Sequence, residues 1–269
     1  MSLLEAYFKS NVTRTLHGKP YPAINPSTRP ELNHAGKTVL VTGGSTGIGM
    51  AIVKSFLAAQ ASTLIITGRV LSKVEEACVP LREKVAASTT NHLANTPQII
   101  AMECDPATPS SINTLWDDLA ARQIHVDVLV LNAARGPKAM PLLAPHDTFW
   151  NSFEINARSP VLFARRFHLQ NKPEPDSGRK VEGPKALVNV STAAIHVDTP
   201  IGRACPDYAL SKTAGMMAMQ MVADEVSPDD MQVVSFHPGV VVTGLMRQAI
   251  GDAEIPSDDG EFSPTPKSI

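Results

Sequence analysis

The stretch TGGSTGIG occupies residues 42–49 and directly follows the β-branched run KTVLV at residues 37–41. Glycine lowers the stability of helices and strands, so four glycines within these eight residues need a structural reason. An amphipathic helical pattern begins at Ile48, at the end of the cluster. A glycine-rich turn between a strand and a helix leaves the first amides of the helix free for a phosphate group, although a plain tight turn has the same composition.

The spacing of the turn, Gly43-x-x-x-Gly47-x-Gly49, differs from the GxGxxG fingerprint of dinucleotide-binding sites. It also lacks the Lys-Ser/Thr ending of a P-loop, which argues against hydrolysis of nucleotide triphosphates. The turn alone favours a cofactor site over a plain turn, and the sequence around it has to decide between them.

Apolar, β-branched runs alternate with helical patterns along most of the chain. The runs lie at residues 38–42, 63–67, 98–104, 126–132, 185–191 and 231–236. They are apolar on both faces, as expected for strands of a parallel sheet that helices cover on both sides. The alternation therefore predicts an α/β fold: a doubly wound parallel sheet of the Rossmann type, with about six strands and helices on both faces.

This pattern divides the chain into three segments. Residues 1–36 begin with a short amphipathic stretch and continue with a proline-rich sequence, which predicts an N-terminal arm. Residues 37–248 form the α/β domain, and residues 249–269 form a polar tail. No further β-branched run follows Thr243, so we expect the sheet to lack a C-terminal strand. An open sheet edge is an association hazard. A homo-oligomer is possible, but the short C-terminus puts it in doubt.

Composition excludes several classes of partner. The net charge of −2 and the pI of about 6.4 give no indication of binding to nucleic acid or to an anionic membrane surface. No run of 18 apolar residues predicts a membrane span, and the N-terminus does not resemble a secretory signal. The cysteines are odd in number, widely spaced and without a metal-binding pattern; they are Cys78, Cys104 and Cys205. We expect a cytoplasmic protein without a metal site.

The end of the second predicted strand indicates which cofactor binds. A dinucleotide-binding unit often places an acidic residue there to hold the adenosine ribose, but this chain has Gly68 and Arg69. A guanidinium group can pair with the 2′-phosphate that distinguishes NADP from NAD. Arg69 therefore favours NADP(H), although a solvated loop arginine is the simpler alternative.

Tyr208 and Lys212 in the segment PDYALSK lie four residues apart on a predicted helix and share one face. Free tyrosine titrates near pH ~10, and a neighbouring ammonium group lowers that pKa toward a useful range for proton transfer. Such a pair is common on exposed helices. Here it follows a strand that ends in NVST (189–192), so it is expected at the carboxyl edge of the sheet, where ligands of open α/β sheets bind.

The ordered motifs resemble those of the short-chain dehydrogenase/reductase family over roughly residues 36–248. The motifs are TGGSTGIG (42–49), Asp105 after the third strand, LNAA (131–134), Asn156, NVST (189–192), YALSK (208–212) and HPGVVVT (237–243). The resemblance implies a catalytic set. Tyr208 would donate the proton to a carbonyl oxygen, Lys212 would lower the tyrosine pKa and bind the nicotinamide ribose, and Asn156 would hold a water. A hydroxyl of Ser191 or Thr192 would orient the substrate, and the sequence leaves open which one.

The resemblance also implies a binding site for the cofactor. Residues Gly43, Ser45, Gly47 and Ile48 would line the pyrophosphate turn, Asp105 would meet the adenine, Asn132 its ribose, and Thr243 the carboxamide. Three of these residues also have a purely structural interpretation: Asp105 as the start of a turn, Asn156 as a cap or kink of its helix, and Thr243 as a helix N-cap.

Three functions stay open from the sequence. The favoured one is an NADP(H)-dependent oxidoreductase that transfers hydride between the cofactor and a small carbonyl or alcohol substrate. The main alternative is a catalytically impaired NADP(H)-binding protein with a regulatory or scaffold role. A methyltransferase also uses a glycine-rich turn, but Arg69 and YALSK argue against it. One feature departs from the family: 16 residues separate Thr192 from Tyr208, so the intervening segment must bulge.

Overall fold

A computed structural model describes residues 21–26, 28–88, 96–143, 148–170, 183–196, 200–239, 241, 243 and 244. Its centre is a six-stranded parallel sheet with the order β3-β2-β1-β4-β5-β6. The strands are β1 (Thr38–Val41), β2 (Thr63–Gly68), β3 (Gln98–Glu103), β4 (Val128–Leu131), β5 (Lys185–Val190) and β6 (Met231–Phe236). The predicted doubly wound parallel sheet is confirmed.

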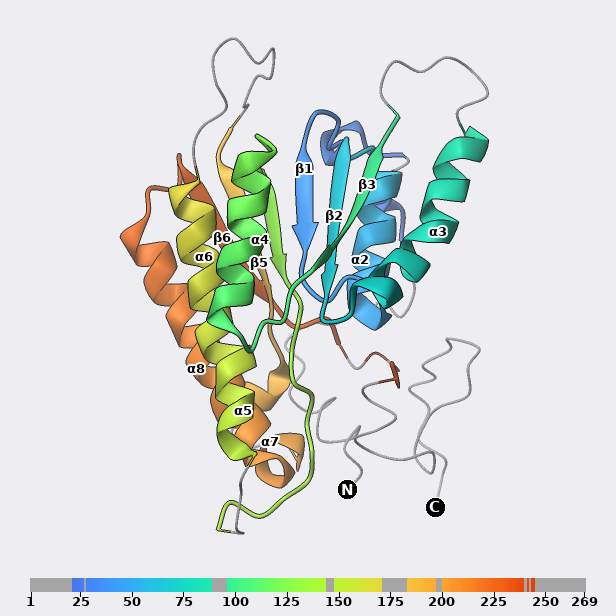
Figure 1. Cartoon of the computed structure of the whole chain (residues 1–269). Coiled ribbons are helices and arrows are strands. Elements are labelled where there is room, and N and C mark those ends of the chain that lie inside the picture. Colours follow the sequence, from blue (N-terminus) through green and yellow to red (C-terminus); the bar gives the residue numbers. More distant parts are fainter. Residues whose placement is uncertain are drawn as a thin grey trace.

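Helices cover both faces of the sheet (Figure 1). One face carries α2 (Gly47–Ala58) and α3 (Leu71–Ser88), and the other carries α4 (Pro109–Ala121), α6 (Ser159–Leu169) and α8 (Pro206–Glu225). Shorter elements lie between them; they are α5 (Phe149–Phe153), the π-helix η3 (Glu154–Arg158), the 3₁₀-helix η5 (Ala193–Ile195) and α7 (Pro200–Ala204). Helices α5 and α7 lie below the carboxyl ends of the strands in Figure 1.

The strand order reverses between β1 and its neighbour β4. Chain connections from these two strands leave toward opposite faces, which opens a crevice at their carboxyl ends. Val39, Leu40 and Val41 of β1 pair in register with Val128, Leu129 and Val130 of β4, so the ends of the two strands stand side by side. The fold therefore brings the glycine-rich turn after β1 next to the segment after β4.

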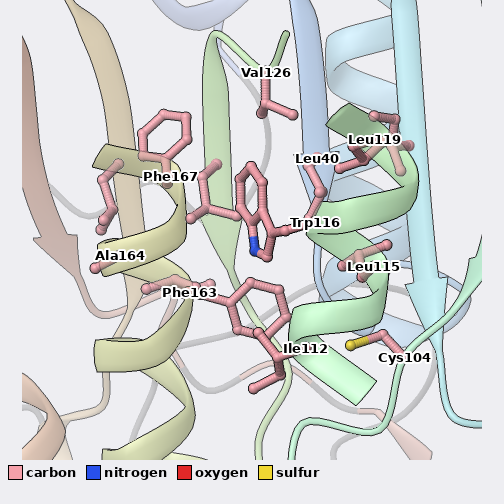
Figure 2. Packing of buried hydrophobic residues seen from close by; sticks show 14 of the residues in the cluster. Leu40, Cys104, Ile112, Leu115, Trp116, Leu119, Val126, Phe163, Ala164 and Phe167 are labelled. Atoms are coloured by element: carbon pink, nitrogen blue, oxygen red, sulfur yellow. The ribbon is translucent and has the colours of Figure 1, made fainter. Parts of the chain in front are cut away.

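Two hydrophobic clusters hold the layers together, one on each face of the sheet. Because successive strand residues point to opposite faces, Leu40 enters one cluster while Val39 and Val41 enter the other. Trp116 of α4 lies at the centre of the first cluster beside Phe163 and Phe167 of α6 (Figure 2), and its ring centroid is 6.2 Å from that of Phe167. This packing fixes α4 and α6 against the sheet and so supports the segments that lead to the site.

The described part of the N-terminal arm packs against the end of α2. It contains two 3₁₀ turns, η1 (Pro22–Ile24) and η2 (Pro30–Leu32). The His34 amide donates to the Ala59 carbonyl at 2.7 Å, and the His34 ring meets Phe56 edge-on at 5.0 Å. The polar, proline-rich sequence of residues 171–183 predicts a loop, and apart from Gly183 this loop lies outside the described residues. The short amphipathic stretch at the N-terminus and the polar tail also lie outside them.

The last described strand, β6, is an edge of the sheet. The segment expected to bulge before Tyr208 contains η5 and α7 in its described residues, so the additional length forms two short helices. Among the described helices, none is both long and apolar enough to cross a membrane. The described residues also contain no group of three or more side chains placed to hold a metal ion.

Candidate active site

The glycine-rich turn after β1 adopts a backbone that needs glycine. Gly43 and Gly47 have φ values of +61° and +52°, in the left-handed region. A Cβ atom on Gly49 would lie 2.2 Å from the Gly43 carbonyl oxygen and 2.6 Å from Nδ2 of Asn132, so no side chain fits there. The turn and the segment after β4 thus approach each other so closely that glycine is required at residue 49. A plain tight turn does not need such close contacts.

Asn132, which follows β4, holds this turn in place. Its Nδ2 group donates to the main-chain oxygens of Thr42 and Gly43, both at 3.0 Å. The buried hydroxyl of Thr42 accepts from the Asn132 and Ala133 amides at 2.9 and 3.0 Å. Both amide hydrogens of Asn132 are therefore used within the protein, and its observed role is to shape the turn rather than to contact a ribose through that group.

The residues predicted to line the pyrophosphate turn are brought together at the start of α2. The helix begins at Gly47, and its N-cap residue, Thr46, makes no side-chain capping bond. The first amides of the helix therefore lack intrahelical partners. Thr243 reaches the same place, because its Cγ2 atom would be 3.2 Å from a Cβ on Gly47. This cradle has the shape and the donors that a pyrophosphate group requires.

The Gly68–Arg69 pair lies beside this cradle. The Ser45 hydroxyl oxygen would be 3.4 Å from a Cβ on Gly68, which places the end of β2 against the turn. Arg69 is exposed and makes no hydrogen bond or ion pair within the described part of the chain. Its guanidinium group is therefore available to an anionic ligand.

Asp105 forms the local turn that was the alternative to a binding role. One carboxylate oxygen accepts from the Ala107 amide at 3.1 Å, and the other accepts from the Thr108 hydroxyl at 3.3 Å. The Asp105 amide donates to Ser111 at 2.9 Å. These bonds shape the loop after β3, and an adenine contact by Asp105 stays a prediction.

The structure separates the two candidate hydroxyls after β5. Thr192 lies near enough to Tyr208 for its hydroxyl to lower the pKa of the phenol. Its Oγ1 accepts from the Ala194 amide at 3.2 Å, so the hydroxyl hydrogen is free to point toward the phenol. Ser191 is buried, and its hydroxyl has no hydrogen-bond partner among the described residues. The geometry places Thr192, rather than Ser191, next to Tyr208.

Burial shifts the pKa values of both Tyr208 and Lys212. Burial raises the pKa of the Tyr208 phenol above its ordinary value, and the Thr192 hydroxyl offsets this only in part. The Lys212 ammonium instead donates to the Val190 carbonyl at 2.8 Å, and burial lowers the pKa of Lys212 to about 8. In the protein without a ligand, burial therefore governs the pKa of Tyr208, and a lowering of that pKa by Lys212 stays a prediction.

Asn156 lies buried in the π-helix η3, and its side chain is fully engaged. Its Oδ1 accepts from the Arg135 amide at 2.9 Å, and its Nδ2 donates to the Arg135 carbonyl at 3.1 Å and to Ser211 at 3.0 Å. The water link expected for Asn156 stays a prediction. Asn156 clamps the segment after β4 onto α8, and its interpretation as a helix-kinking residue is supported by the π turn.

Two supporting residues were not predicted from the sequence. Ser211 connects Asn156 to α8, because its hydroxyl also donates to the Tyr208 carbonyl at 3.0 Å. A buried serine inside a helix usually bonds the carbonyl one turn back, so its position three residues after Tyr208 was a usable signal. Asp207 is also buried and accepts from Ser152 at 2.7 Å, which ties the start of α8 to α5.

Comparison with known proteins identifies relatives of this chain. A family model described as short chain dehydrogenase matches residues 37–254. Short chain dehydrogenase pigC of Monascus ruber is 30% identical over 254 residues, which cover 94% of this chain and 77% of that protein. A short chain dehydrogenase/reductase of Claviceps purpurea is 32% identical over 254 residues, with 93% and 77% coverage.

Solved structures show the same fold. A metagenomic short-chain oxidoreductase in complex with NADP is 26% identical, with a TM-score of 0.59 over 77% of this chain and 84% of its own. The RhlG/NADP complex of Pseudomonas aeruginosa is 22% identical, with a TM-score of 0.67 over 82% and 78% of the two chains. The family model and the curated relatives together show that this chain belongs to the short-chain dehydrogenase/reductase family of oxidoreductases.

Proposed function

We propose that the protein is an NADPH-dependent carbonyl reductase that uses Tyr208 as its proton donor and can also run toward alcohol oxidation. The observation that carries this proposal is the contact between Thr192 and Tyr208 at the carboxyl edge of the sheet, close to a turn that only glycine can form. A donor, a polarising hydroxyl and a phosphate cradle on one edge are what carbonyl reduction by a nicotinamide cofactor requires.

The residues divide the work of the reaction. NADPH, when bound, supplies the hydride. Tyr208 gives its proton to the carbonyl oxygen of the substrate, and the Thr192 hydroxyl orients that oxygen. The raised pKa of Tyr208 keeps the phenol protonated at neutral pH, which is the form that reduction needs. Lys212, held at the end of β5, would bind the nicotinamide ribose, and its ammonium group would stabilise the phenolate left after proton transfer.

NADP is the favoured cofactor because of the end of β2. Arg69 offers an exposed guanidinium where a 2′-phosphate is expected, and no acidic residue follows β2 to hold a 2′-hydroxyl. The solved relative at 26% identity holds NADP. We further propose a cytoplasmic location, which fits three unpaired buried cysteines.

The experiment that tests the cofactor proposal is a titration of the protein with NADPH and with NADH. We expect NADPH to bind more tightly, and Arg69→Met to weaken NADPH binding about 10- to 100-fold while leaving NADH binding unchanged. Arg122→Met is the matched control, because Arg122 is paired with Asp118 on the far end of α4. Tighter binding of NADH by the wild type would overturn the assignment of NADP.

A further inference from the structure

The main chain of Arg135 is fixed beside the catalytic helix by consecutive hydrogen bonds. The Asn156 side chain accepts a hydrogen bond from the Arg135 amide at 2.9 Å and donates one to the Arg135 carbonyl at 3.1 Å. It also donates to the Ser211 hydroxyl at 3.0 Å. Ser211 in turn donates to the Tyr208 carbonyl at 3.0 Å. Arg135 therefore stands at the carboxyl end of β4, three hydrogen-bonded steps from the proposed proton donor.

The side chain of Arg135 is partly buried and makes no hydrogen bond or ion pair within the described part of the chain. Taking a guanidinium group partly out of water without an acceptor costs free energy, and a protein usually compensates it with a carboxylate or a phosphate. Here that compensation is absent among the described residues. A partly buried arginine on a rigidly held backbone, next to an active site, fits an anionic group of a ligand.

The wall around Arg135 carries positive charge. The segment 135–143 meets α7 through the Met140 amide, which donates to the Ala204 carbonyl at 3.0 Å. Lys138 and Arg203 are exposed on these two segments. Asp207 is the one carboxylate among the described residues 135–143, 193–196 and 200–208, and it is buried and bonded to Ser152 rather than to a cation. Among the described residues of these segments, the exposed charged side chains are thus cationic, which favours an anionic ligand.

We propose that Arg135 recognises a carboxylate on the substrate, so that the substrates are small keto or hydroxy compounds that carry a carboxylate group. This inference rests on the proposed function, and it names the substrate class of the same site. Arginine suits the role because its planar group binds both oxygens of a carboxylate at once. The other anionic group that could bind Arg135 is a phosphate of the cofactor. The first amides of α2 and Arg69 already provide donors for those phosphates, whereas Arg135 is tied to the Tyr208 helix.

The test compares keto acids with their methyl esters. NADPH affinity is measured first, and then a panel of small keto acids and the corresponding esters is titrated against the NADP⁺-saturated protein and assayed for turnover with NADPH. We expect the wild type to prefer the acids, and Arg135→Met to reduce this preference about tenfold or more. Arg135→Lys should retain part of it, since the charge stays while the two-pronged contact is lost.

Folding does not confound these variants, because Asn156 holds Arg135 through its main chain alone. Arg122→Met is the control: it removes a cation from the far end of α4, away from this segment, and should leave the acid preference nearly unchanged. No preference for acids in the wild type overturns the inference, as does a preference that survives Arg135→Met. A loss of NADPH affinity in Arg135→Met equal to the loss of acid affinity assigns the guanidinium to the cofactor instead. Absence of NADPH binding by the wild type rejects the proposed function itself.

Discussion

The hydroxyls of residues 191 and 192 are neighbours in sequence but lie in different surroundings. Successive side chains of an extended segment point to opposite sides, so only one of them can face Tyr208. Thr192 does so, while Ser191 is buried without a partner in the described part of the chain. The selection is made by backbone direction rather than by the chemistry of the hydroxyl.

This difference predicts opposite results for two similar variants. Thr192→Ala removes the hydroxyl that orients the carbonyl, and we expect kcat to fall about 10²-fold or more. Ser191→Ala removes a buried hydroxyl that makes no bond, so kcat should stay close to that of the wild type. Thr192→Ser, which keeps the hydroxyl, should recover most of the activity. Equal losses in Thr192→Ala and Ser191→Ala would show that the two hydroxyls share the role.

The lowered pKa of Lys212 predicts how the stability of the protein without a ligand depends on pH. Its pKa is about 8 when folded, against an ordinary value of 10.5. Between these two pH values the unfolded chain binds more protons at this position than the folded chain, so the contribution of Lys212 to stability rises with pH. The free energy of unfolding of the wild type relative to Lys212→Met should therefore increase from pH 8 to pH 10.5. Urea denaturation of both proteins measures this, and parallel pH curves would contradict it.

At the scale of elements, the π-helix η3 and helix α8 define each other's positions. A Cβ atom on Gly215 of α8 would lie 2.1 Å from the Asn156 carbonyl oxygen, so the two backbones touch only because residue 215 is glycine. On the neighbouring turn, Ser211 takes the bond from the Asn156 side chain. The catalytic face of α8 is thus placed by backbone contact with η3 and by the clamp of Asn156.

Gly215→Ala should disturb both elements at once. The added methyl group must push η3 away from α8, and we expect the free energy of unfolding to fall by about 1–3 kcal/mol, with a loss of kcat as the Asn156 clamp shifts. Met217→Ala is a suitable control, because Met217 is 49% exposed on the same helix. Thermal denaturation and kcat of both variants check this. A Gly215→Ala protein with wild-type stability and kcat would mean that the contact is not tight in solution.

At the scale of the whole molecule, the periodic signals predicted the fold well. The six predicted strands and the helices between them are present, because buried parallel strands leave uninterrupted apolar runs in the sequence. The stretch from residue 147 to 170 is different: its sequence predicts one long helix, whereas its described residues form α5, η3 and α6. A π turn adds one residue to a helical turn, and this change in the apolar periodicity is too small to be recognised in the sequence.

The site was predictable in composition but not in its contacts. Motif spacing singled out Tyr208, Lys212 and the glycine turn as candidates for one site. The bonds of Asn132 to Gly43, of Asn156 to Arg135 and of Lys212 to Val190 join segments far apart in sequence. Their pairing depends on the final packing, and so does the raised pKa of Tyr208, which results from burial. The local sequence around each residue therefore predicts neither these hydrogen bonds nor the raised pKa of Tyr208.

The most direct test of the central claim is a comparison of Tyr208→Phe with the wild type, in which NADPH affinity and NADPH consumption with a carbonyl substrate are measured on the same preparations. Removing the proton donor should lower turnover about 10²- to 10⁴-fold and leave the dissociation constant for NADPH unchanged. Turnover by Tyr208→Phe at the wild-type rate would contradict the role of this phenol, and a wild type that binds NADPH but reduces no carbonyl would favour a regulatory or scaffold protein.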